Sequence, residues 1–104
     1  MDKLTREDAA AEVVHDADLS RYTLWRDGEP AGLVDYRIVD DAIHFIHTEI
    51  DPAKRKHGLA GILVEQALDD VRTRTDLTVV AACPFVAGWI DQHAEYQDLL
   101  SRGT

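Results

Sequence analysis

The feature that most constrains the fold is a succession of strand, helix and strand patterns over residues 43–82. Residues 43–50 form a β-rich run, and residues 77–82 form a short apolar run bounded by turn signals. Between these runs, apolar residues recur at helical spacing: Ala60, Leu63, Val64, Ala67, Leu68 and Val71. The pattern predicts a helix from about Gly58 to Arg74, followed by a buried strand. A strand, a crossover helix and a second strand form a right-handed βαβ unit.

Shorter strand patterns precede this unit and predict an antiparallel β-meander. A strand is expected to begin at 13–15, and 22–25 and 31–39 are expected to pair around the hairpin signal Asp27-Gly28. Short helical pieces are expected after Cys83 and over 93–100. The predicted fold class is therefore α/β (α+β), a β-meander followed by a βαβ unit and short C-terminal helices.

The third meander strand, 43–50, carries several polar side chains. A period of two predicts two faces, with Ile43, Phe45, His47 and Glu49 on one and His44, Ile46, Thr48 and Ile50 on the other. His44 and His47 are then on opposite faces, so a shared metal site is not expected, and no other metal site is predicted.

Composition limits how many domains the chain can form and which kinds of partner it can bind. A chain of 104 residues with 45% hydrophobic content is expected to form one domain, with residues 1–11 as an arm or a short helix. A net charge of -9 argues against nucleic-acid binding and against an anionic membrane surface. The N-terminus lacks an apolar signal region and no apolar run is long enough to span a bilayer, so a cytoplasmic protein is expected. A monomer is expected because the sequence shows no long exposed heptad or apolar surface pattern. Cys83 is the only cysteine, which excludes an intrachain disulfide.

The hexamer Arg55-Lys56-His57-Gly58-Leu59-Ala60 lies between the strand and helix patterns. A glycine there lets the backbone pass close to a bulky group, and the first N–H groups of a helix have no partners within it. These N–H groups, together with the helix macrodipole, would form a site for a pyrophosphate. The cations of Lys54, Arg55 and Lys56 would lie beside this site. By itself the spacing R-x-x-G-x-A is weak, and a helix start with solvated cations is the alternative.

Four spaced segments add a resemblance to a known family. In chain order they are His47-Thr48-Glu49-Ile50, Arg55-x-x-Gly58-x-Ala60, Cys83-Pro84-Phe85-Val86 and His93-Ala94-Glu95-Tyr96. With the predicted order of elements, they resemble the Gcn5-related N-acetyltransferase superfamily, and within it a small single-domain subfamily of predicted acetyltransferases. The resemblance runs from about Arg21 to Leu100.

This resemblance implies that acetyl-CoA is the cofactor. Its pyrophosphate would bind backbone amides of the loop at Lys56, His57, Gly58, Leu59 and Ala60, beside Arg55. Its pantetheine arm would lie along Thr48, Glu49 and Ile50, where that strand splays from 77–82. Larger relatives carry extra helices that form much of the acceptor pocket, and this chain has no room for them. A tyrosine that often serves as general acid corresponds here to Trp89, whose indole N–H does not protonate a thiolate.

Two residues are candidates for catalysis. Cys83 would lie at the end of a strand and the start of a helix, where the helix N-terminus favours a thiolate. It is a candidate acetyl carrier, and a buried structural cysteine is the alternative. His47 is a candidate base or orienting partner, and a core histidine is the alternative.

The leading hypothesis is an N-acetyltransferase that moves acetyl from acetyl-CoA to an amine, such as a lysine of a protein or peptide, by direct attack or through Cys83. The acidic excess is most simply a solvated face, and the alternative is that it attracts a basic acceptor such as a lysine-rich peptide or a polyamine. A non-catalytic acyl-CoA binding or sensing module is the alternative. A third hypothesis, thiol redox or hydrolytic chemistry at Cys83, is weakened because no second cysteine is present.

Overall fold

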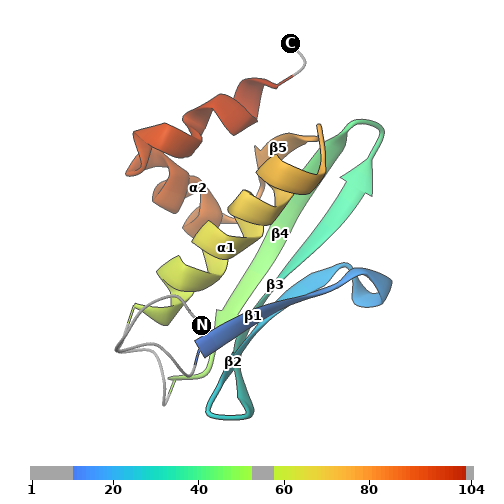
Figure 1. Cartoon of the computed structure of the whole chain (residues 1–104). Coiled ribbons are helices and arrows are strands. Elements are labelled where there is room, and N and C mark those ends of the chain that lie inside the picture. The colour runs from blue at the N-terminus through green and yellow to red at the C-terminus, as the bar shows by residue number, and fades with distance from the viewer. Residues whose placement is uncertain (1–10, 53–57, 103–104) are drawn as a thin grey trace.

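The protein forms a five-stranded sheet with its helices packed against it (Figure 1). This computed structural model describes residues 11–52 and 58–102. The predicted arm, except for Ala11, and the loop residues Arg55, Lys56 and His57 therefore lie outside the described residues. The elements are β1 (Ala11–Asp16), η1 (Ala17–Leu19), β2 (Arg21–Arg26), β3 (Glu29–Val39), β4 (Ala42–Ile50), α1 (Leu59–Arg74), β5 (Thr78–Ala81), α2 (Pro84–Asp91) and η3 (Ala94–Ser101).

The sheet confirms the predicted topology. Its strands lie in chain order, with β1 to β4 antiparallel and β4 parallel to β5. The β2–β3 hairpin turns at Asp27 and Gly28, which both have positive φ, as a two-residue type I′ turn requires. Helix α1 connects the parallel pair, as expected for a βαβ unit.

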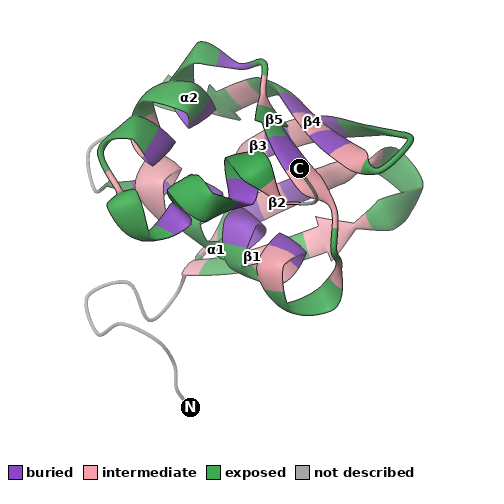
Figure 2. Cartoon of the chain, turned by 90° about the horizontal axis from the view of Figure 1, so that it is seen from above, coloured by how far each residue is buried: buried purple, intermediate pink, exposed green. Residues whose placement is uncertain are grey.

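The core lies between the sheet and the helices. Buried positions face one another there, as Figure 2 shows by colour. The buried side of α1 consists of Leu59, Leu63, Val64, Ala67, Leu68 and Val71. The predicted stripe began at Ala60, which is wrong by one residue, because Leu59 is fully buried and Ala60 only half-buried. Leu59 is the first helical residue and turns inward to close the end of the core.

The prediction that β5 is a buried strand is also only partly right. Val79 is 2% exposed, but its neighbour Val80 is 37% exposed. The reason is that β5 lies at the edge of the sheet and, among the described strands, pairs only with β4. Helices cover one of its faces, and an apolar run does not reveal whether the second face is covered.

The predicted faces of β4 are wrong beyond Phe45. Tyr36 pairs with Phe45, but Asp35 pairs with His47, so β4 has one extra residue, Ile46, at a β-bulge. The bulge reverses the alternation. Thr48 and Ile50 therefore share the helix side with Phe45, and His47 and Glu49 turn to the opposite, exposed face.

The same bulge places His44 and His47 on one face, because their partners Arg37 and Asp35 lie two residues apart on β3. The prediction that they point to opposite faces was therefore wrong. Within residues 11–52 and 58–102, no group of three metal-ligating side chains comes together. None of the helices described here is long and apolar enough to cross a membrane.

Candidate functional site

The parallel strands β4 and β5 separate halfway along β4. Their pairing covers Ala42 to Phe45 on β4 and ends at Ala81 on β5. One further hydrogen bond, from the Cys83 N–H to the Phe45 carbonyl at 2.8 Å, marks the point of separation. Beyond it β3 still pairs with β4 as far as Ile50. On the side of β5, no described strand pairs with residues 46–50.

Cys83 lies at this point of separation and is 6% exposed. Its Sγ is 3.3 Å from the hydroxyl oxygen of Thr48, and either atom can be the donor. Cys83 is also the N-cap residue of α2, in extended conformation before Pro84. The sulfur thus faces both the free half of β4 and the N-terminus of a helix.

The surroundings of the sulfur favour its ionised form. Burial raises the pKa of the Cys83 thiol, but hydrogen bonding from the Thr48 hydroxyl and from backbone groups of Val86, Phe85 and Thr48 outweighs burial, so the pKa lies below its ordinary value. A thiolate is the nucleophilic form of cysteine. The arrangement can therefore support nucleophilic chemistry at the sulfur.

His47, the other predicted catalytic residue, is not near Cys83 on the helix side. The bulge turns it to the exposed face, where its Nε2 lies 2.9 Å from Oε2 of Glu49. The two side chains are 54% and 65% exposed. Of the strand residues expected to bind pantetheine, the structure brings Thr48 beside Cys83 and leaves Ile50 half-buried, whereas Glu49 points away. A catalytic role for His47 stays a prediction.

The N-terminus of α1 begins at Gly58, the N-cap residue. Gly58 has φ +69, the left-handed region that favours glycine, and no side chain caps this helix end. A Cβ at this position would meet no atom of the described residues within 4 Å, which leaves open space beside the cap in this part of the chain. Leu59 anchors the first turn in the core, which holds the helix N-terminus in place. Unsatisfied N–H groups with open space in front of them fit a phosphate group.

Trp89 is engaged in packing on α2. Its Nε1 would lie 3.3 Å from a Cβ placed on Gly61, so the indole packs against the first turn of α1. The His93 ring stacks on it with centroids 3.7 Å apart, and Tyr96 contacts it edge-on at 5.1 Å. Trp89 and Tyr96 are therefore packing residues, whereas Phe85, in the first turn of the same helix α2, is 42% exposed.

The sequence did not predict the contact between Thr48 and Cys83, because this contact depends on the bulge at Ile46, which no local pattern marks. It also missed the close approach of α2 to α1 at Gly61. A glycine in the interior of a predicted helix is a signal for such an approach. The site therefore lies on a mixed five-stranded sheet whose parallel strands separate at Cys83.

The chain belongs to the GCN5-related N-acetyltransferase family, whose sequence model matches residues 21–99. This confirms the resemblance drawn from the four segments. A search of curated proteins found no match.

Two solved structures share the fold. The ribosomal-protein-S18-alanine N-acetyltransferase from Escherichia coli is 18% identical, with a TM-score of 0.57 over 70% of this chain and 50% of that one. The ribosomal-protein-alanine N-acetyltransferase from Brucella melitensis biovar Abortus 2308 is 20% identical, with a TM-score of 0.55 over 76% of this chain and 59% of that one. This chain thus spans about half of the length of those two proteins. At 18% and 20% identity, the similarity to these two structures shows a shared fold and nothing further.

Proposed function

We propose that the protein is an acetyl-CoA-dependent N-acetyltransferase that acts on an amine, with Cys83 as the nucleophile that first accepts the acetyl group. The observation that carries the proposal is the position of Cys83 Sγ, 3.3 Å from Thr48, where β4 and β5 separate. Family membership supports the reaction class.

Two parts of the chain would hold the cosubstrate. The first-turn N–H groups of α1 after Gly58, with Leu59 and Ala60, would bind its pyrophosphate, aided by the predicted contacts of Arg55, Lys56 and His57. The unpaired edge of β4 over Thr48 to Ile50 would hydrogen-bond the pantetheine arm. Bound acetyl-CoA supplies an activated thioester.

The residues around Cys83 would prepare the sulfur for transfer. The thiolate attacks the acetyl carbonyl carbon, a new S–C bond forms, and the thiolate of coenzyme A departs and takes up a proton. A deprotonated amine then attacks the acetyl-cysteine, the C–S bond breaks as the amide forms, the amine nitrogen releases one proton to solvent, and the Cys83 thiolate is regenerated. Thr48 would hold the sulfur in position. The chain's net charge of -9 would attract a basic amine acceptor, such as a lysine of a protein or peptide.

A non-catalytic acyl-CoA binding or sensing module is the second candidate. The packing of Trp89 against Gly61 and His93 favours it, because the position that often carries a tyrosine acid is filled by a packed indole. Such a module needs the N-terminus of α1 but not Cys83.

The test is to incubate the full chain with radiolabelled acetyl-CoA, alone and with a lysine-rich peptide. Transfer through Cys83 predicts thiol-sensitive label on the protein that moves to the peptide and is absent in Cys83→Ala. Peptide label that survives Cys83→Ala would overturn the covalent route and establish direct attack. Binding without label on protein or peptide would establish the sensing module.

Gly58→Glu tests the helix end, and Gly28→Glu is its matched control. Both glycines have positive φ and open space at the Cβ position, so the two substitutions add the same strain and the same charge. Only Gly58→Glu is expected to abolish acetyl-CoA binding, measured by calorimetry, because Gly28 lies in the β2–β3 turn. Equal binding by both variants would overturn the proposed cofactor site.

A further inference from the structure

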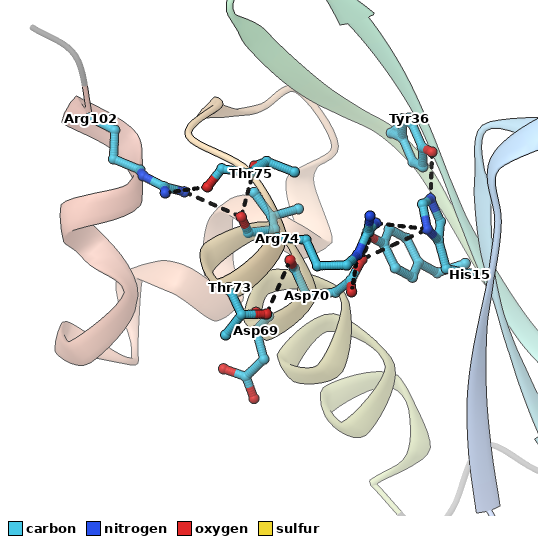
Figure 3. Close-up of polar contacts among 10 residues, drawn as sticks. His15, Tyr36, Asp69, Asp70, Thr73, Arg74, Thr75 and Arg102 are labelled. Atoms are coloured by element: carbon cyan, nitrogen blue, oxygen red, sulfur yellow. Dashed lines mark hydrogen bonds and ion pairs between the residues drawn. The ribbon is translucent and has the colours of Figure 1, made fainter.

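Several charged side chains on the helix side of the sheet bond to one another. Figure 3 shows one such group, where the end of α1 meets β1. Arg74 donates to both carboxylate oxygens of Asp70 at 2.6 and 2.7 Å, and its Nη2 is 2.9 Å from His15 Nδ1. Groups that are bonded in this way have little capacity left for a ligand. The face of the sheet that points away from the helices is different.

This outer face carries its own rows of side chains. Directly paired residues share a face, and Thr23, Leu33 and Glu49 are paired across β2, β3 and β4. Trp25 and Pro30 are paired beside them. These five side chains are half-buried or exposed, whereas the alternate positions of β2 are buried in the core. Helices α1 and α2 lie on the opposite side of the sheet (Figure 1).

A surface hollow lies on the outer face, and part of its lining is apolar. Leu19, Trp25 and Leu33 belong to this part. Leu19 is 59% exposed and Trp25 is 37% exposed. Exposed apolar side chains that gather around a hollow are typical of a surface that binds another molecule.

Charge in the hollow is negative. In the described part of the chain, its charged lining residues are three carboxylates, Asp16, Glu49 and Asp51, and one guanidinium, Arg21. Arg21 Nε already donates to Asp35 at 2.7 Å. The hydrogen bond and charge of Asp35, followed by the charges of Glu49 and Asp16, raise the pKa of Arg21. Four carboxylates thus accompany one guanidinium on this face, which favours a cationic partner.

The hollow adjoins the sulfur of Cys83 through two consecutive residues of β4. Thr48 contacts Cys83 Sγ at 3.3 Å on the helix side, and Glu49 lines the hollow on the outer face. Glu49 Oε2 contacts His47, but Oε1 has no hydrogen-bond partner within residues 11–52 and 58–102. No described strand pairs with this half of β4 on the side of β5, so its edge does not separate the hollow from the sulfur.

We propose that the hollow docks a basic segment of a protein or peptide acceptor, a step that rests on the acetyltransferase function proposed above. A lysine or arginine whose aliphatic stem packs on Leu33 and Trp25 places its cation beside Glu49, because Leu33 and Glu49 are directly paired. A second basic side chain meets Asp16, and a neighbouring lysine reaches Cys83 around the free edge of β4. A second copy of this chain is disfavoured as the occupant, because two chains of net charge -9 repel each other.

The test is a titration of the full ¹⁵N-labelled chain with a lysine-rich peptide, followed by NMR. The chain has two tryptophans, so the indole N–H signals of Trp25 and Trp89 report on the two faces of the sheet. Saturable shifts are expected for the Trp25 indole and the amides of Leu33 and Glu49, with weaker binding as sodium chloride is added. Shifts at Trp89 alone, or no saturable shift, would overturn the proposal. Shifts of the hollow that follow protein concentration without peptide would assign it to a second copy and also overturn the proposal.

Variants connect the binding to the named side chains. Glu49→Gln and Asp16→Asn are each expected to weaken peptide binding about threefold, and together about tenfold. Trp25→Ala is expected to weaken it about tenfold or more. Glu65→Gln, at an exposed position of α1, removes the same charge and is the control, with thermal unfolding of each variant as the check on folding. Wild-type affinity in the double variant, or equal weakening in Glu65→Gln, would overturn the docking surface.

The transfer assay separates this proposal from the proposed reaction. Asp16→Asn is expected to raise KM for the peptide about threefold and to leave KM for acetyl-CoA unchanged. Transfer with the wild-type KM for the peptide in Asp16→Asn would overturn the docking surface and leave the proposed function intact. Saturable binding of the peptide at the hollow without transfer would overturn the reaction alone.

Discussion

The two halves of β4 have the same neighbour on one side and different surroundings on the other. Residues 42–45 lie between β3 and β5, and Phe45 is 1% exposed. Among the described strands, residues 46–50 pair only with β3; they begin with a bulge and include the half-buried Thr48 and the exposed His47. One half of the strand therefore supplies the core, and the other half leaves backbone and side chains available for binding.

This difference shows how a small domain can combine a stable core with a binding edge on one strand. Pairing on both sides satisfies the backbone groups of the first half. In the second half, the groups that would face β5 stay available to a ligand. Substitutions in the two halves should consequently separate stability from chemistry.

Phe45→Ala is expected to have the largest effect, a loss of about 3–5 kcal/mol in the free energy of unfolding, because the buried ring leaves a cavity. Ile46→Ala, at the adjacent position on the same strand, is the control. Ile46 is 45% exposed, so a change within about 0.5 kcal/mol is expected. Urea denaturation measures both, and similar losses would contradict the division of β4.

Gly32→Ala is expected to lose about 2 kcal/mol, the cost of forcing an extra atom into a packed site. A Cβ on Gly32 would lie 2.4 Å from Ile50 Cδ1 and 2.9 Å from the Glu49 carbonyl oxygen, so β4 would have to move. Gly88→Ala in α2 meets no atom within 4 Å and is the matched control, with an expected gain of up to ~1 kcal/mol. Thermal unfolding of the pair is the measurement, and a stabilised Gly32→Ala would refute the close approach.

Thr48→Val keeps the shape of the side chain and removes its hydroxyl, with an expected loss of ~1 kcal/mol in stability. The pKa of Cys83 should rise, because Thr48 helps to lower it. The rate of alkylation by iodoacetamide as a function of pH measures this shift.

The midpoint of that profile should lie at higher pH in Thr48→Val and near the wild-type value in Thr48→Ser. Because the pKa of Cys83 is lower in the folded than in the unfolded protein, wild-type stability should increase as pH rises through the folded value, and Thr48→Val should reduce this increase. An unchanged midpoint in Thr48→Val would mean that the hydroxyl does not act on the sulfur.

His47→Gln is expected to have the smallest effect on stability, at most ~0.5 kcal/mol, because its contact with Glu49 is exposed. Acetyl transfer to a lysine-rich peptide then tests the predicted catalytic role without interference from unfolding. Wild-type turnover would remove His47 from the catalytic residues.

Local features were predictable from the sequence, and features that depend on pairing were not. Asp27-Gly28 determines its own turn, and the apolar spacing of α1 predicted the helix to within one residue. The faces of β4 were predicted wrongly because the bulge at Ile46 arises from pairing with β3, and one extra residue inverts everything after it. The position of Cys83 at a helix start was predicted, but its partner Thr48 was not.

By itself, the sequence determined the order of elements, the β2–β3 turn, the start of α1 at Gly58 and, through four spaced segments, the family. These properties depend on residues that are close in the chain. Only the tertiary structure decided which side chains meet across long separations, such as Cys83 with Thr48 and Arg74 with His15. The physical reason is that strand register and helix packing are set by the whole core, and a shift of one residue brings different side chains together.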